Sequence, residues 1–282
     1  MEGAHLNEAH LEGAYLSGAH LEGAFAYTGH FEGASLSSAH LEGVNLFGAH
    51  LEGAILSEVF VDSSTKLNKI FLANKQYGVV SLADVHWRDV NIAVVDWSKI
   101  SKLGDESTAL QRTRYDGRPK TELEYLDGFR TAVRAYRQLS TILRNQGLNE
   151  DAARFAYRAQ MLQRTVFRLK GGVRSFLQYL FSLFLDLLAG YGYKPWRSFL
   201  AYLLVITAFA TAYFVFGHTV GPVLSPLGSL VFSMTSFHGR GFFPGGIQLD
   251  DPLTVLAALE AFVGLLIEVT FIATLTQRLF GK

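Results

Sequence analysis

The sequence predicts a multi-domain membrane protein with a repetitive N-terminal segment, a helical pair and two apolar spans. Residues 4–63 divide into consecutive fives with a small residue first and a larger apolar residue third. Apolar residues recur at threes and fours between residues 123 and 166, which is typical of helices. Two apolar runs, residues 198–217 and 253–275, flank the shorter apolar stretch 225–237. We predict domains at residues 1–100, 101–172, 173–197 and 198–282.

Composition also favours membrane residence. Apolar residues make up 49% of the 282 residues, and the mean hydropathy of +0.20 is high for a soluble protein. The formal net charge is zero, but residues 1–65 hold nine acidic residues and no Lys or Arg, so the remainder is +9. The chain has no cysteine, so disulfides and thiolate metal sites are excluded and a reducing compartment fits.

A period of five residues fits neither an α-helix nor a flat strand. The chain must turn a corner at every repeat, with the small and the larger apolar residue facing inward. The first two repeats are Ala4-His5-Leu6-Asn7-Glu8 and Ala9-His10-Leu11-Glu12-Gly13. This spacing resembles the pentapeptide-repeat family, which implies a right-handed, four-sided β-solenoid with four repeats per coil. The resemblance covers residues 4–63 and weakens toward residue 100, and stacking at ~4.8 Å places residues twenty apart above one another.

Histidine recurs every ten residues, each time two places before a glutamate. The five are His10, His20, His30, His40 and His50. On a coil of twenty, His10, His30 and His50 form one column, with His20 and His40 on the opposite side. The column is a candidate pH-sensing or metal-binding surface, because histidine titrates near pH 6.5. We favour the alternative of a solvated face produced by internal duplication, and we predict no metal or cofactor.

The acidic N-terminal segment, residues 1–65, also fits a second class of protein. Pentapeptide-repeat proteins include DNA mimics that bind gyrase, and a segment of 65 residues without Lys or Arg matches that charge. That interpretation leaves the membrane half unexplained, so we rank it second and expect no nucleic acid partner.

The segment from Ser98 to Pro119 is polar and contains Gly104-Asp105-Glu106, which predicts a loop. Helical periodicity follows, Gly147 breaks it, and Asn149 is predicted to cap a second helix. The antiparallel pair faintly resembles a single tetratricopeptide repeat that seats a partner peptide. We favour a spacer that packs against its copies in neighbouring subunits.

A basic cluster precedes an aromatic-rich apolar segment at residues 173–197. The cluster comprises Arg164, Arg168, Lys170 and Arg174. Each cation near anionic headgroups contributes about 1 kcal/mol, so we predict an amphipathic helix in the cytosolic interface of the bilayer. Asp186 and the short length argue against a third span. Tyr191, Tyr193 and Trp196 suit an aromatic belt.

The outer apolar runs each have the ~20 residues that cross ~30 Å of hydrocarbon as a helix, whereas residues 225–237 are too few. This middle piece is expected to dip into the bilayer and return, which requires its polar backbone to be shielded from lipid. Such a pattern is typical of a pore. The flanking cations, with no secretory signal at the N-terminus, predict a plasma-membrane protein with both termini cytoplasmic. They are Lys194, Arg197, Arg278 and Lys282.

Ser225 is predicted to cap the short helix, and Pro226 suits its first turn. Residues 225–237 resemble the pore helix of two-span potassium channels, and the resemblance extends over residues 198–278 and implies a homotetramer. The family's Thr-Val-Gly-Tyr-Gly filter aligns with Gly239 to Phe243, where only Gly241 is retained, so potassium selectivity is not expected. The candidate pore and filter residues are Thr235, Ser236, Phe237, His238, Gly239, Arg240, Gly241, Phe242 and Phe243.

Ionisable residues of this segment have two interpretations each. Arg240 either faces the axis and favours anions or, as we prefer, pairs with Glu260 behind the filter. Gly264 permits close packing or a bend. Glu268 either rings a water-filled vestibule that concentrates cations or is a hydrogen-bonded structural carboxylate. His238 either tunes conductance with external pH at the mouth or is a packed spacer.

These observations predict an oligomeric, cation-conducting channel whose N-terminal domain gates or tethers it. The competing class is a non-conducting membrane-anchored scaffold whose acidic segment recruits a partner. We expect no enzyme, because Gly-x-Ser-x-Gly, His-Glu-x-x-His and a phosphate-binding Gly-rich loop are all missing from the sequence.

Overall fold

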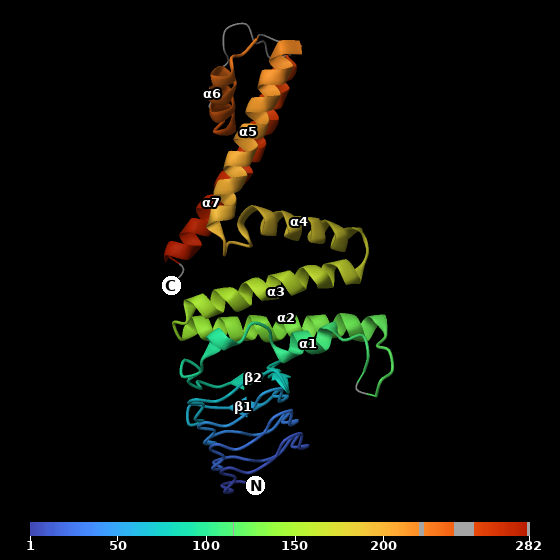
Figure 1. The fold of residues 1–282 in the computed structure, drawn as a ribbon, viewed down its shortest axis with the longest axis vertical. Helices are drawn as coiled ribbons and strands as arrows, with labels where there is room; N and C mark the ends of the chain where they lie inside the picture. Colours follow the sequence, from blue (N-terminus) through green and yellow to red (C-terminus); the bar gives the residue numbers. More distant parts are fainter. Residues whose placement is uncertain (115, 220–222, 240–250, 281–282) are drawn as a thin grey trace. The chain divides into compact units, whose positions relative to one another are not determined.

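The computed structural model describes residues 1–114, 116–219, 223–239 and 251–280 (Figure 1). The chain divides into two compact units, Met1–Leu180 and Phe181–Gly281. Each unit has its own apolar core. The boundary between them falls within helix α4 (Val173–Ala189).

Residues 1–100, called the coil region below, wind in coils of twenty residues. Parallel bridges join residues twenty apart, as in His10↔His30 and Ser35↔Ile55. From residue 21 onward nearly all inward positions are buried, as at Ala34 (0% exposed) and Leu36 (1%), and those of the first coil, such as Leu6 and Leu16, are partly buried against the same core. The prediction that the small and the larger apolar residue face inward is therefore confirmed. Strand β1 (Phe60–Val61) pairs in parallel with β4 (His86–Trp87).

Two insertions explain why the repeat weakens after residue 63. The bridge Asn45↔Lys66 spans 21 residues, and Ile55↔Ser81 spans 26. The Asp62 carboxylate accepts the backbone N–H groups of Gly43, on the preceding coil, and of Ser64 and Thr65, and so holds the extra residue in place. The second insertion lengthens the bridged span from 21 to 26 residues. Its five additional residues lie in the antiparallel hairpin of β2 (Ala73–Asn74) and β3 (Gly78–Val79).

The corner residue of each five has a left-handed backbone, which Gly53 (φ +68°) and Gly13 (φ +66°) both adopt. A Cβ on Gly53 would lie 2.1 Å from the carbonyl oxygen of Tyr77, whereas nothing lies within 4 Å of one on Gly13. Alanine at either site incurs about 1–2 kcal/mol of backbone strain. Only Gly53→Ala must also displace the β2–β3 hairpin.

We therefore expect Gly53→Ala to increase deuterium uptake in peptides covering residues 73–79, measured by hydrogen exchange on the full chain. Gly13→Ala is the matched control and is expected to leave uptake there unchanged. Equal uptake in the two variants would show that the hairpin does not press on the Gly53 corner.

The segment predicted to be a loop contains helix α1 (Gly104–Leu110) and a short 3-10 turn, η1 (Trp97–Lys99). The loop prediction is wrong there because its polar residues are buried and hydrogen-bonded. Asp105 is 7% exposed, and its carboxylate accepts the backbone N–H groups of Leu82 at 2.7 Å and Ala83 at 3.2 Å. The carboxylate thus holds α1 against the last coil.

The predicted helical pair is confirmed as α2 (Glu122–Asn145) and α3 (Asn149–Lys170). Thr121 and Glu124 form a capping box at the start of α2. The predicted cap of the second helix is wrong: Asn149 is already helical, and Leu148 is the N-cap without a side-chain hydrogen bond.

The helical pair and the coil region share one apolar core. The side chain of Gln146, the C-cap of α2, accepts the N–H groups of Ile92 and Ala93 and donates to the carbonyl of Val90 at 2.7 Å. These bonds satisfy backbone groups that the last coil would otherwise leave unpaired at an open edge. Residue 100 is therefore not a boundary between separate structural units.

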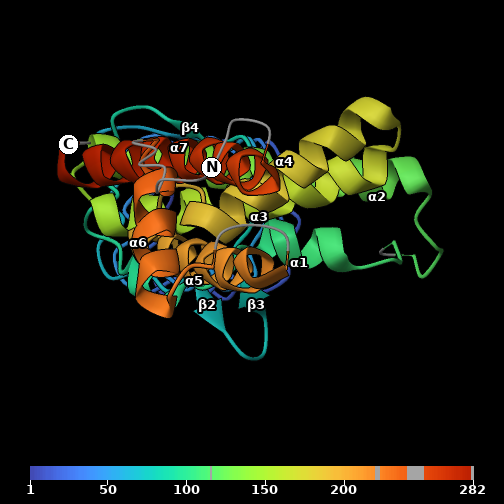
Figure 2. The same cartoon turned by 90° about the horizontal axis from the view of Figure 1, so that it is seen from above.

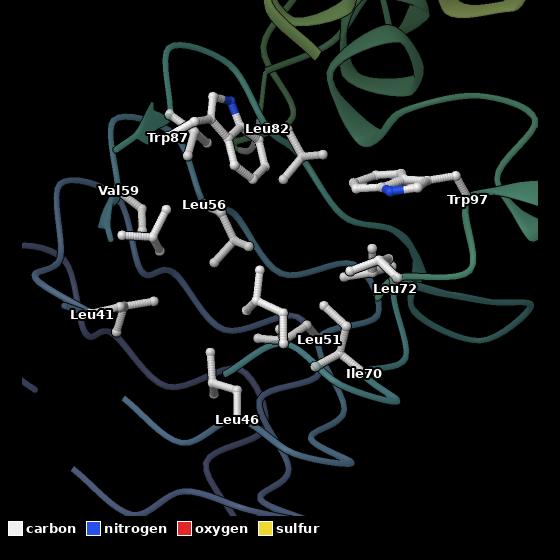
Figure 3. A pocket seen from close by; sticks show the side chains of 14 residues that line it. Leu41, Leu46, Leu51, Leu56, Val59, Ile70, Leu72, Leu82, Trp87 and Trp97 are labelled. Carbon is white, nitrogen blue, oxygen red and sulfur yellow. The ribbon is translucent and has the colours of Figure 1, made fainter. Parts of the chain in front are cut away.

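The core of the coil region contains a cavity of about 30 Å³ with a wholly apolar lining (Figure 3). Leu51, Leu72 and Trp97 are among the lining residues. The indole nitrogen of Trp97 donates to the carbonyl of Ile92 at 2.9 Å, so it does not need a partner in the cavity. An apolar void of this size is a packing defect rather than a ligand site.

The second unit contains α5 (Pro195–Thr219), α6 (Pro226–Phe237) and α7 (Pro252–Phe280). The segments Trp196–His218 and Pro252–Thr276 are long and apolar enough to cross a membrane. Helices α5, α6 and α7 contact one another, and Figure 2 views them from above. Two long apolar helices with a short one between them confirm the predicted element order.

Candidate functional site

Helix α6 begins as the sequence predicts. The hydroxyl of Ser225 accepts the N–H of Gly228 at 3.0 Å, and Pro226 occupies the first turn. Its 12 residues extend only ~18 Å, too little to cross ~30 Å of hydrocarbon.

Two apolar clusters fix how far α6 reaches along its neighbours. The first joins Phe232 of α6 to Tyr213 and Leu253, near the end of α5 and the start of α7. The second joins Phe237, the last residue of α6, to Ile206 and Ile267. Ile206 lies near the middle of the 25-residue α5, and Ile267 near the middle of the 29-residue α7. Helix α6 therefore ends about halfway along both candidate spans.

Gly264 permits the close approach of α6 to α7. A Cβ at this position would lie 2.1 Å from the carbonyl oxygen of Phe237 and 3.0 Å from its carbonyl carbon. Both contacts are with backbone, which cannot rotate out of the way. The C-terminal turn of α6 thus rests directly on the α7 backbone.

Glu260 is fully buried between the three helices. The hydroxyl of Tyr213 donates to its carboxyl group at 2.7 Å, and the hydroxyl of Ser233 donates to the other oxygen. Sequence reasoning missed both donors, although a tyrosine within an apolar span signals a need for a polar partner. Arg240, the predicted partner of Glu260, lies outside the described residues, so that pairing stays a prediction.

His238 and Glu268 form a hydrogen-bonded pair where α6 ends. Their side chains are 42% and 37% exposed. The sequence predicts His238 at the mouth and Glu268 deeper in a vestibule, but the structure brings them together because α6 ends beside the middle of α7. Ionisable groups halfway along a membrane-spanning helix would face water or protein.

The other predicted pore residues divide into two groups. Ser236 and Phe237 are buried, Thr235 donates its hydroxyl proton to the carbonyl of Phe232, and Gly239 has φ +65°. Arg240, Gly241, Phe242 and Phe243 lie outside the described residues. The filter therefore stays a prediction.

In the coil region the histidines form two ring stacks, as the twenty-residue period predicts. The first column contains His10, His30 and His50, whose successive ring centroids are 4.8 and 4.9 Å apart. The second column contains His20 and His40, whose centroids are 4.7 Å apart. Each histidine lies beside the glutamate two residues later, with Nδ1–carboxylate distances from 2.8 to 3.5 Å.

These His–Glu contacts are more exposed at the N-terminal end than further along. The hydrogen bond and charge of Glu12 raise the pKa of exposed His10, and the hydrogen bond from His10 lowers the pKa of Glu12. Glu32 and Glu52, by contrast, are only 8% and 5% exposed. The pH-sensing role stays a prediction.

The basic cluster lies at the end of α3 and the start of α4 and is largely exposed, as at Arg168, Lys170 and Arg174. Helix α4 exposes apolar side chains, including Phe176, Leu177, Leu180, Phe181 and Leu187. Asp186 accepts from Arg197 at 3.1 Å, so this acidic residue within the apolar segment is paired. An interfacial position for the helix stays a prediction.

Comparison with known proteins classifies part of the chain. The family model described as pentapeptide repeats matches residues 1–26 and 30–60, in eight copies. No curated protein matches the chain. The chain thus combines N-terminal pentapeptide repeats, which imply a solenoid-like region, with a helical C-terminal part that has two candidate membrane-spanning helices.

Proposed function

We propose that this chain is the subunit of an oligomeric cation channel in the plasma membrane. In this proposal α5 and α7 span the bilayer, α6 is a re-entrant pore helix, and both termini are cytoplasmic. The coil region, as a right-handed four-sided solenoid, gates the channel or tethers it to a partner. The observation that carries the proposal is the end of α6 halfway along both candidate spans, on the backbone at Gly264.

The electrostatics at the end of α6 favour cations. The C-terminus of a helix carries a partial negative charge of about half an electron, from carbonyl groups without partners in the helix. The carboxyl group of Glu268 lies beside this helix end, hydrogen-bonded to His238. A helix end and a carboxyl group at the same depth lower the energy of a cation in an otherwise apolar layer.

A single chain does not enclose an axis, so copies must complete the pore. Helix α6 exposes Leu227, Val231 and Met234, although it packs on two neighbouring helices. Lipid or a second subunit covers such a face. Similarity to two-span potassium channels favours a tetramer, while the different filter residues argue against potassium selectivity.

The test is planar-bilayer recording from the purified full chain in symmetrical KCl, followed by reversal potentials under a KCl gradient. We expect cation-preferring currents. Glu268→Gln is expected to lower conductance and cation preference several-fold, because the carboxylate concentrates cations locally. Glu8→Gln, an exposed site in the coil region, is the matched control and is expected to leave both unchanged.

Each result separates the two function classes. Unchanged conductance and selectivity in Glu268→Gln would remove Glu268 from the conduction pathway. Electrical silence of the wild-type chain under voltage, acid and membrane stretch would favour the non-conducting scaffold.

A further inference from the structure

We propose that the two His–Glu columns of the coil region bind divalent transition-metal ions between successive coils, with Zn²⁺ as the representative ion. This proposal is independent of channel function. It concerns the pentapeptide repeats alone and is tested by binding.

Three groups of side chains bring their ligand atoms within 4.8 Å of one another. They are His20, Glu22 and His40; Glu12, His30 and Glu32; and Glu32, His50 and Glu52. Because residues twenty apart lie on adjacent coils, each group draws ligands from two coils. A metal ion bound there would join one coil to the next.

The distances around His50 fit a zinc ion. Its Nδ1 atom is 3.2 Å from a carboxylate oxygen of Glu52 and 4.0 Å from one of Glu32. Zinc binds nitrogen and oxygen at 2.0–2.2 Å with tetrahedral angles, which places the donor atoms about 3.3 Å apart. Small shifts of two side chains therefore create a three-ligand site, and a water molecule would be the fourth ligand.

The ligand types indicate which ions fit. Imidazole with carboxylate suits Zn²⁺, Cu²⁺ and Ni²⁺. Calcium and magnesium prefer oxygen ligands, whereas every group contains at least one imidazole nitrogen. The columns are therefore expected to select transition metals over Mg²⁺ and Ca²⁺.

Unsatisfied carboxylate oxygens point independently to a missing cation. One oxygen each of Glu32 and Glu52 is buried without a hydrogen-bond partner among the described residues. Buried polar atoms of this kind are costly unless something compensates them. Residues 1–65 contain no Lys or Arg, and within the described part of the chain one arginine, Arg88, forms an ion pair with these columns, 3.9 Å from Glu42. A divalent ion supplies the positive charge that the sequence leaves out.

The test is isothermal titration of ZnCl₂ into the tag-free full chain in detergent, after removal of metal with EDTA. The double variant Glu22→Gln and Glu32→Gln removes one ligand from all three groups. The control, Glu8→Gln with Glu58→Gln, changes the charge equally at glutamates outside the groups. We expect saturable zinc binding by wild type and control, unaffected by Mg²⁺, and at least tenfold weaker binding by the double variant.

X-ray absorption at the zinc edge is expected to show imidazole and carboxylate ligands in the wild-type complex. Circular dichroism checks that the double variant is folded; if it is not, it is replaced by the triple variant His30→Gln, His40→Gln and His50→Gln, which also removes one ligand from each group. Absence of saturable binding would overturn the proposal, as would equal affinity in wild type and variant, because the zinc would then bind at other histidines such as His86 or His218.

Discussion

Replacing Glu106 with glutamine is expected to destabilise the first unit by about 3 kcal/mol, because it breaks a buried ion pair. Glu106 is 2% exposed, and its carboxylate accepts hydrogen bonds from the guanidinium of Arg158 and from the hydroxyl of Tyr136 at 2.7 Å. Tyr136 is fully buried and accepts the backbone N–H of Leu103 at 2.8 Å. Glutamine would leave the cation without its counter-ion.

The decrease in the free energy of unfolding at low pH gives a second test of the role of Glu106. Burial raises the pKa of this carboxyl, but the hydrogen bonds from Arg158 and Tyr136 outweigh burial and hold the pKa below its ordinary value. Its stabilisation is therefore fully present above the ordinary glutamate pKa and is lost as pH falls through the folded-state pKa. Glu106→Gln is expected to flatten this acid-side loss.

Asp105, one residue earlier, acts in the opposite direction. Burial raises its pKa, and the N–H groups of Leu82 and Ala83 only partly offset that effect. The stabilisation that Asp105 contributes is present below the ordinary aspartate pKa and is lost as pH rises through the folded-state pKa of this carboxyl. The acid-side slope of wild type is thus the net result of two neighbouring carboxyls.

Urea unfolding of the full chain, followed by tryptophan fluorescence at several pH values, measures these effects. Trp97 packs edge-on against Phe155 in the same core and reports on it. The control is Asp127→Asn, which removes an exposed ion pair with Arg130 and is expected to cost less than about 1 kcal/mol. An equal decrease in the free energy of unfolding in Glu106→Gln and Asp127→Asn would mean that the hydrogen bonds of Glu106 do not join α1 to the helical pair.

Replacing Gly264 with alanine is expected to separate α6 from α7 and abolish conduction. The new Cβ would lie 2.1 Å from the Phe237 carbonyl oxygen, so one backbone must move by more than 1 Å to reach ordinary contact. Such a shift would also separate His238 from Glu268. Thermal unfolding in detergent is expected to occur at a lower temperature, and bilayer recordings are expected to show no openings.

The matched control adds bulk on another face of α7. Ala258 is exposed, so Ala258→Val is expected to leave both unfolding temperature and currents unchanged. If Gly264→Ala melts like wild type, the close approach of α6 to α7 is absent from the protein in solution. If it is destabilised while wild type itself is silent, the packing holds and the channel proposal fails.

The sequence pattern predicts those elements that depend on residues close to one another in the chain. The period of five residues, the inward alanine and leucine positions, and the Ser225 cap all follow from neighbours in sequence. Local pattern failed at the Asn149 cap and at α1, whose Asp105 and Glu106 are predicted to lie in a polar loop. Their burial depends on donors far along the chain, such as Leu82 and Tyr136, which no local pattern specifies.

The sequence by itself determined that the chain begins with stacked five-residue repeats and ends with two helices long enough to cross a bilayer, because periodicity and length are local quantities. Only the tertiary structure decided that Glu260 is held by Tyr213, 47 residues earlier, and that Glu268 meets His238. It also decided that the helical pair completes the core of the coil region. The physical reason is that the packing of helices determines which side chains meet. This packing depends on the complementary shapes of helices that are distant in sequence.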